Sequence, residues 1–165
     1  MIHKREATYS ILVILLALIL VAGLVYIALK TINPTKFLDK TRDATRGEDL
    51  QKLQTALDLY IADGKNFNTL NVGEIYISDN KTENNGQGWL PINFNLVSSG
   101  APIEVLPTDP LNQGQYIYQV GINLTQKTYE IDCRFESNQY QSQAKNDGGN
   151  NPNLYEIGTD LTILK

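Results

Sequence analysis

The pattern of hydrophobic and polar positions begins with an apolar run from Ile11 to Leu29, ILVILLALILVAGLVYIAL, which contains no charged residue. Because an α-helix rises about 1.5 Å per residue, this run would span roughly 30 Å, the thickness of the hydrocarbon core of a bilayer. Basic side chains gather in residues 1–10, and only Lys30 follows the run closely. By the positive-inside rule, we expect a single-pass helix over residues 11–30 in the cell membrane, with a cytoplasmic N-terminus and an extracytoplasmic C-terminal domain.

A cleaved secretory signal is the alternative interpretation of the same run. The apolar part of such a signal is usually only about 7–15 residues long and ends at a small-residue cleavage site. Here the run is longer and continues directly into Lys30, Thr31 and Ile32. Its length therefore favours a membrane helix that is kept.

Asn33 and Pro34 interrupt the helical pattern, because proline lacks an N–H and clashes with the preceding turn. Two interpretations compete: one long helix kinked at Pro34, or a break in which Asn33 caps a new helix and Pro34 takes its first position. In both, helix resumes and stops near Gly64, a typical C-terminal signal. The apolar positions before this stop recur at helical spacing and make one face: Leu50, Leu53, Leu57, Tyr60 and Ile61.

The stretch from Pro34 to Gly47 is different, because charged side chains dominate it and its apolar residues are Phe37, Leu38 and Ala44. We expect this stretch to bury little within its own domain. Its expected role is to bridge the anchor to the globular part, or to contact other copies of the chain.

After Gly64 no further helical pattern occurs, and short strand patterns alternate with Gly-, Asn- and Pro-rich loops. Tyr129, Ile131 and Cys133 alternate with polar residues, which predicts a strand with one buried face. Strands are expected at 74–78, 116–120, 128–135 and 155–158, with 121–126 as a hairpin connection and 146–153 as a turn-rich loop.

The expected fold class is therefore α+β, with a long N-terminal transmembrane helix, kinked near Pro34, packed on a small antiparallel sheet. The expected organisation is a short cytoplasmic or leader segment at 1–10, the transmembrane helix at 11–30, its amphipathic continuation at 31–64, and a globular β-rich head at 65–165.

Composition narrows the function classes. The chain has 14 Lys and Arg against 18 Asp and Glu, a net charge of −4, so it lacks the excess of basic residues typical of nucleic-acid binders. Cys133 is the single cysteine, which excludes an intrachain disulfide. It is either a free or intermolecular thiol or, as we favour, a small buried hydrophobic side chain on a strand.

Candidate chemistry is sparse. The single histidine, His3, precedes the apolar run, so Ser–His and Cys–His systems of the usual kind are excluded from the head. We therefore expect no catalytic residues and no cofactor, and the chain is not expected to be an enzyme. Asp147, Asn150 and Asn153 are weak candidates for a calcium site, but Asx-rich turns also form for backbone reasons alone, and we favour that interpretation.

Several short segments follow one another along the chain in a characteristic order. They are Ile32–Lys36 with Thr41–Arg46, Asp49–Tyr60, Leu106-Pro107-Thr108-Asp109-Pro110 before Tyr116-Ile117-Tyr118, and Asn146–Gly149 with Tyr155–Leu161. In this order they resemble segments of bacterial type IV pilins and type II secretion pseudopilins, especially the major pseudopilin class. The resemblance extends from about Tyr9 to the C-terminus.

The resemblance implies a pilin-like structural subunit that is assembled into a pilus or pseudopilus filament through its hydrophobic helix. Implied partners are other copies of the chain, the cytoplasmic membrane, the pilus or secretion assembly machinery and a prepilin peptidase. The residues that would carry assembly are Glu6, Ile11, Leu15, Leu18, Val21, Val25 and Pro34.

The N-terminus departs from the family pattern. Family members carry Gly-Phe-Thr-Leu-Ile-Glu, are cut after the glycine, and pair the glutamate with the terminal amine of a neighbouring subunit. Here the corresponding run is Lys4-Arg5-Glu6-Ala7-Thr8-Tyr9-Ser10-Ile11. Glu6 is either the equivalent acid or a charge at the membrane interface, and both interpretations stay open.

A second function class is a permanently anchored, single-pass adhesion or binding protein that is neither processed nor polymerised. In that case the Tyr-, Asn- and Gln-rich loops, with Trp89, would hold a ligand such as a polysaccharide.

Overall fold

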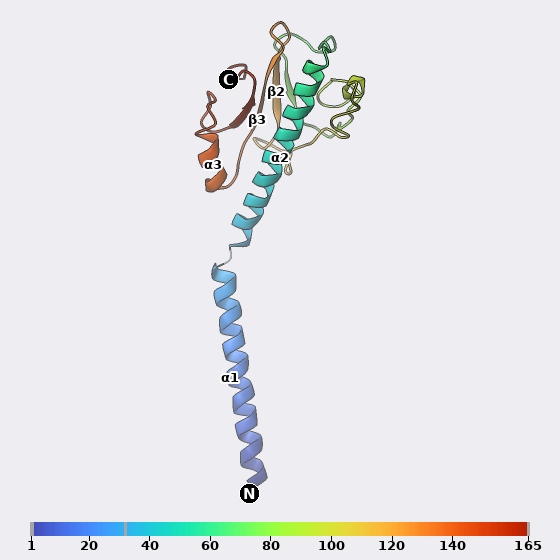
Figure 1. The fold of residues 1–165 in the computed structure, drawn as a ribbon. Helices are drawn as coiled ribbons and strands as arrows, with labels where there is room; N and C mark the ends of the chain where they lie inside the picture. Colours follow the sequence, from blue (N-terminus) through green and yellow to red (C-terminus); the bar gives the residue numbers. More distant parts are fainter. Residues whose placement is uncertain (1, 32, 165) are drawn as a thin grey trace. The chain divides into compact units, whose positions relative to one another are not determined.

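The computed structural model describes residues 2–31 and 33–164 of the chain (Figure 1). It divides into two compact units, Met1–Leu38 and Asp39–Lys165. The first unit holds α1, Ile2–Thr31, and the start of α2, Pro34–Ala62, and the second holds the rest of α2 and the head. The remaining elements are the strands β1 Ile75–Ile77, β2 Gln119–Asn123, β3 Thr128–Cys133 and β4 Tyr155–Gly158, the helix α3 Asn138–Ala144 and a 3₁₀ turn at Phe94–Leu96. This architecture confirms the α+β class.

α1 ends at Thr31 and α2 begins at Pro34, so the helix is broken here and Asn33 caps a new helix. The Asn33 carboxamide oxygen accepts a hydrogen bond from the Thr35 hydroxyl at 2.6 Å and one from the Lys36 N–H at 3.4 Å. Pro34 takes the first helical position, where its missing N–H costs nothing. The expectation of a kink is corrected: Pro34 starts a separate helix.

The C-terminus of α2 is closed by Gly64, as predicted. Gly64 has φ +71°, its N–H donates to the Ile61 carbonyl at 2.9 Å, and the Lys65 N–H donates to the Tyr60 carbonyl at 3.3 Å. This pair of bonds is a Schellman motif, which requires a left-handed residue at the position of Gly64.

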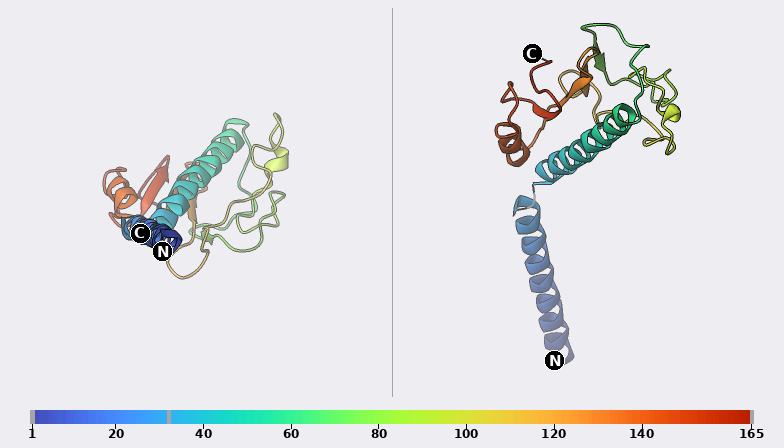
Figure 2. Two further views of the ribbon diagram at one scale, coloured as in Figure 1. Left: turned by 90° about the horizontal axis from the view of Figure 1, so that it is seen from below. Right: turned by 45° about the horizontal axis from the view of Figure 1, so that its top comes forward.

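The four strands form one antiparallel sheet in the order β1-β2-β3-β4. One face of this sheet lies against α2, and α3 lies beside β4, while the long segment between β1 and β2 lies on the other side of α2 (Figure 2). The core between α2 and the sheet is apolar and well buried: Leu50, Leu53, Leu57, Tyr60, Tyr118, Val120, Tyr129, Ile131 and Cys133 are among its members. The buried position of Cys133 confirms the favoured interpretation of that residue.

The second strand is displaced from its predicted position. The sequence placed it at 116–120 with a turn from Gly121, whereas β2 is Gln119–Asn123 and Gly121 pairs with Glu130 inside the ladder. A Cβ atom at Gly121 would lie 2.8 Å from side-chain atoms of Ile163 and Leu164, so the glycine admits the C-terminal segment rather than making a turn. The predicted hairpin is confirmed, since β2 pairs with β3 in antiparallel fashion, but its connection is 124–127 and not 121–126.

The other strands agree with the predicted ones in place, with small differences in length. β1 falls within 74–78, β4 matches 155–158, and β3 starts at Thr128 but ends two residues before Phe135. The expectation of no helix after Gly64 is wrong, because α3 occupies Asn138–Ala144. The Ser137 hydroxyl caps α3, and Tyr140 packs on Phe135 with ring centroids 5.2 Å apart. A seven-residue helix held by a cap and one aromatic contact has no apolar repeat that a sequence pattern could show.

Two glycines, one within α2 and one just after it, provide a matched test of the backbone geometry. Gly47 lies in the helix interior and Gly64 at its C-terminal stop, and a Cβ atom would meet no atom within 4 Å at either position. We expect Gly47→Ala to raise the free energy of unfolding by about 1 kcal/mol, because alanine loses less backbone entropy. Gly64→Ala is expected to lower it by about 1–2 kcal/mol, because φ +71° is strained for an L-residue. Urea unfolding measures both, and changes of the same sign would contradict the geometry.

Candidate functional site

The most prominent candidate for a functional feature is the apolar surface of α1. Residues Ile11–Lys30 form the one helix, among the residues that the structure describes, that is long and apolar enough to cross a membrane. Every side chain from Ile11 to Lys30 is exposed, and the predicted assembly residues Ile11, Leu15, Leu18, Val21 and Val25 are each more than half exposed. The side chain of Glu6 lies outside the described residues, and Pro34 begins α2.

A helix that is apolar on all sides needs an apolar environment around its whole circumference. Lipid or other polypeptides can supply such an environment. The same length and composition also fit an N-terminal signal sequence, the alternative interpretation of this run.

A buried ion-pair network surrounds Arg46, where α2 enters the head. The guanidinium of Arg46 is fully buried and makes a two-point contact with Asp109, with Nε–Oδ2 2.6 Å and Nη2–Oδ1 3.0 Å. Its Nη1 also donates to Asp43 at 2.8 Å and to Glu136 at 2.6 Å, and its Cζ atom lies 5.0 Å from the ring centroid of Tyr116. Four of the five N–H donors of the guanidinium are therefore engaged within the head.

The carboxylates around Arg46 are held by further bonds. Asp43 accepts the backbone N–H groups of Glu136 at 2.9 Å and Ser137 at 2.7 Å, directly before α3. Glu136 also receives two bonds from Arg42, both at 2.7 Å, and these lower the pKa of its carboxyl group. Burial alone would lower the pKa of Arg46, but its hydrogen bonds to Asp109, Glu136 and Asp43 outweigh burial and raise it.

This network corrects the expectation that the stretch from Pro34 to Gly47 buries little. Its apolar side chains Phe37 and Leu38 are exposed, as expected, but Asp43 and Arg46 are completely buried. A signal was present in the sequence: Arg46 lies one helical turn before Leu50, on the face that carries the apolar residues of α2. A charge at that position requires a buried counter-charge elsewhere, and the sequence does not show that Asp109 provides it.

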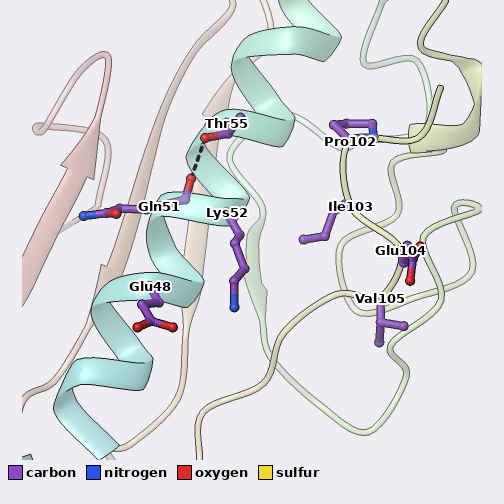
Figure 3. A pocket seen from close by; sticks show the side chains of 8 residues that line it. All are labelled: Glu48, Gln51, Lys52, Thr55, Pro102, Ile103, Glu104 and Val105. Atoms are coloured by element: carbon purple, nitrogen blue, oxygen red, sulfur yellow. Dashed lines mark hydrogen bonds between the residues drawn. The ribbon is translucent and has the colours of Figure 1, made fainter. Parts of the chain in front are cut away.

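An open groove of about 620 Å³ runs along α2 in the head (Figure 3). Glu48 and Lys52 line it from α2, and Ile103, Glu104 and Val105 line it from the facing loop. Lys52 reaches toward the gap between the two walls, while Val105 is largely exposed. The lining mixes both signs of charge with apolar groups and contains no histidine or cysteine, so it offers contact surface rather than an obvious reacting group.

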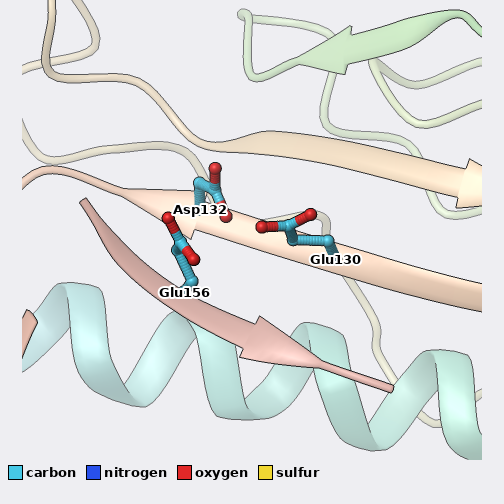
Figure 4. A group of neighbouring side chains, drawn as sticks. All are labelled: Glu130, Asp132 and Glu156. Atoms are coloured by element: carbon cyan, nitrogen blue, oxygen red, sulfur yellow. The ribbon is translucent and has the colours of Figure 1, made fainter. Parts of the chain in front are cut away.

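A second buried polar group lies at β3 and β4, where the carboxylates of Glu130, Asp132 and Glu156 point toward one another (Figure 4). All three side chains are at most 2% exposed. Burial, reinforced by the charges of Glu130 and Glu156, raises the pKa of Asp132 to about 8, and burial raises the pKa values of Glu130 and Glu156 as well. Sequence reasoning missed this cluster, because strand alternation places Glu130 and Asp132 on the face expected to meet solvent.

The weak calcium candidates of the loop before β4 are engaged in hydrogen bonds of the chain. Asp147 accepts the N–H groups of Gly149 at 2.9 Å and Glu156 at 2.8 Å. The Asn150 side-chain amide donates to the carbonyls of Leu161 and Leu164, and the Asn153 N–H donates to the Asn151 side chain. These bonds are those of an Asx-rich turn, the interpretation that we favoured for this loop.

Trp89, which the binding-protein alternative would place in a ligand site, is only 6% exposed. Its indole N–H donates to the Pro107 carbonyl at 3.1 Å. The ring is therefore part of the core and presents no aromatic surface to a ligand.

Together, these features define an α+β protein with a small antiparallel four-stranded sheet and one N-terminal helix that is long and apolar enough to span a membrane. Comparison with protein-family models, with curated proteins and with solved structures finds no match for the chain.

Proposed function

We propose that the chain is a structural subunit of a type IV pilus-like or pseudopilus filament, assembled through the helix at 11–30 and exposing its head. The observation that carries the proposal is the apolar surface of this helix, which is exposed along its whole length, together with the resemblance of the sequence to pilins and pseudopilins.

The energetics of such a helix support storage in a membrane followed by transfer into a bundle. In water, each exposed Leu, Ile or Val side chain would cost about 1.5–3 kcal/mol relative to a buried one. Lipid tails are as apolar as leucine, so transfer from lipid to a helix bundle changes this term little. A subunit can therefore leave the bilayer only if identical helices take over the role of the lipid, and repeated contacts of this kind that do not close give a filament.

The ion-pair network around Arg46, which lies in the head, also supports this proposal. Asp109 belongs to the Leu106–Pro110 segment that resembles pseudopilins. Tyr116 begins the Tyr116–Tyr118 segment that follows it and shares this resemblance. In this chain the two residues hold the guanidinium of Arg46, and so they fasten α2 to the loops of the head. A subunit whose filament contacts lie on its helix and whose head is displayed outside needs such a firm connection.

In the proposed arrangement the N-terminus is cytoplasmic and the head is extracytoplasmic, and the assembled filament lies at the cell surface. The partners are other copies of the chain, the cytoplasmic membrane and a pilus or secretion assembly machinery. A prepilin peptidase would act in residues 1–10 if the segment is a leader, and Glu6 would then be the acid that pairs with a neighbouring amine. We expect no catalytic activity.

The test is to express the full chain, with an epitope tag at the C-terminus, in a bacterial host that carries a pilus assembly machinery. Immunogold electron microscopy of sheared surface material is expected to show labelled filaments. Mass spectrometry of that material is expected to find peptides from residues 11–30 and to define the N-terminus.

Two outcomes would contradict the proposal. Recovery of the chain solely as an unassembled membrane monomer would favour the permanently anchored binding protein, with the groove along α2 as its remaining surface. Recovery of a soluble head that lacks residues 11–30 would show that the apolar run is a cleaved signal.

A further inference from the structure

The side of the sheet that faces away from α2 carries a buried acidic layer. Tyr129 and Ile131 of β3 face the apolar core, and the Tyr129 hydroxyl donates to Asp58 of α2. Alternation along the strand therefore turns Glu130 and Asp132 to the opposite face. Glu156 of β4 joins them, because Asp132 and Glu156 are paired residues in the antiparallel ladder.

Parts of the chain distant in sequence cover this layer and fix two of the three carboxylates. One oxygen of Glu130, Oε2, accepts the Leu164 N–H at 2.6 Å. The two oxygens of Glu156 accept the N–H groups of Asn150 at 2.7 Å and Asn151 at 2.8 Å. A Cβ atom on Gly149 would lie 1.5 Å from the Glu156 carboxylate, so only glycine allows the loop to close over it.

After these bonds, buried oxygens remain without any partner. They are Oε1 of Glu130 and Oδ1 of Asp132, on side chains that are 0% and 2% exposed. No salt bridge joins any of the three acids to a cationic side chain in the described part of the chain. Three buried carboxylates with no cation beside them are costly, since a buried charge normally requires a counter-charge or a metal.

We propose that Glu130, Asp132 and Glu156 bind a calcium ion. One oxygen from each residue lies within 4.8 Å of the others, with no movement of the chain. Oxygens on opposite sides of a calcium ion bound at about 2.3–2.6 Å lie about 4.6–5.2 Å apart, so all three fit in one coordination shell. The donor set is carboxylate oxygen only, which selects a hard cation over zinc or copper.

Calcium fits this place better than magnesium. Magnesium demands a near-ideal octahedron and keeps several of its waters, whereas calcium accepts irregular shells and replaces water with protein oxygens. The cluster is buried beneath the C-terminal segment and the loop before β4, which leaves little room for a hydrated ion. The bound ion would join β3 to β4 and, through Glu130, hold the C-terminal segment against the sheet.

The experiment uses the full chain in detergent micelles after removal of metals with a chelator. Isothermal titration with calcium is expected to show one ion bound per chain. Thermal unfolding, followed by the fluorescence of Trp89, is expected to shift upward by about 10 °C when calcium exceeds its Kd roughly hundredfold. Asp132→Asn and Glu130→Gln keep the shape of the site but remove charge, and each is expected to weaken calcium binding at least about tenfold.

Glu104→Gln is the matched control, because it removes one negative charge from the exposed groove and should leave calcium binding unchanged. Full calcium binding by both Asp132→Asn and Glu130→Gln would place the ion elsewhere and overturn the proposal. So would an equal response to magnesium, or a wild-type protein that binds no calcium. If a variant does not fold, the calcium titration of the wild-type chain still tests whether an ion is bound. This result does not depend on whether the chain forms filaments.

Discussion

Replacing Arg46 with methionine is expected to lower the free energy of unfolding of the head by about 3–5 kcal/mol. The substitution leaves the carboxylates of Asp109 and Asp43 buried without their cation, while methionine fills only part of the volume. Since whole domains are stable by about 5–15 kcal/mol, a loss of this size would leave the head marginal. Urea unfolding of the full chain in mild detergent, monitored by Trp89 fluorescence, measures the change, because Trp89 is the single tryptophan and lies in the core.

Arg42→Met is the matched control for this experiment. Arg42 lies one turn earlier on α2 and shares Glu136 with Arg46, but its side chain is 26% exposed. Solvent screens such a pair, and we expect a loss of about 1 kcal/mol or less. Equal losses for the two variants would mean that burial does not decide the strength of the network, contrary to the structure.

The second large effect is expected from Leu18→Lys, at the middle of the apolar helix. Within a bilayer one lysine at the centre of a helix costs about 2.5–3.5 kcal/mol, which a run of this length tolerates because the side chain can reach toward the interface. In a filament core the charge would meet apolar helices on every side, and burial of an unpaired charge is far more costly. The variant is therefore expected to stay in the membrane but to form no filaments.

Membrane fractionation and electron microscopy of surface material separate these two effects. Leu18→Met is the control, because it keeps the volume and the apolar character and should assemble normally. A Leu18→Lys chain that still forms filaments would contradict a helical core around residue 18. A chain that is lost from the membrane would show that the substitution acts on insertion, and Leu18→Ser then provides a milder polar change at the same position.

The sequence predicts correctly those helices in which every residue of one face has the same kind of environment. The run at 11–29 is apolar on all sides, and the face from Leu50 to Tyr60 packs on a single core. Length and periodicity are therefore enough to predict both helices. Pro34 and Gly64 act through their own backbones and Asn33 through bonds to its neighbours in sequence, so the sequence alone places the helix ends correctly. What it left open, a kink or a break, depends on bonds of the Asn33 side chain that only the structure shows.

The failures have a common cause in contacts between distant segments. Gly121 resembles a turn residue, but it lies in a strand because Ile163 and Leu164 pack on it. Glu130 and Asp132 alternate with apolar residues as solvent-facing positions do, yet the C-terminal segment covers them. Arg46 finds its main partner 63 residues away, and no local pattern indicates a pair of that separation.

The position of Cys133 has a practical consequence for following assembly. Its thiol is 1% exposed in the core, and burial raises its pKa well above the usual value, so it reacts slowly with maleimides and other thiol reagents. Because it is the single cysteine of the chain, a second cysteine introduced on the head would be the one thiol that a dye reaches in the folded protein. The natural sequence is thus already suited to site-specific fluorescent labelling of the head, with which the formation of the proposed filaments could be followed on living cells.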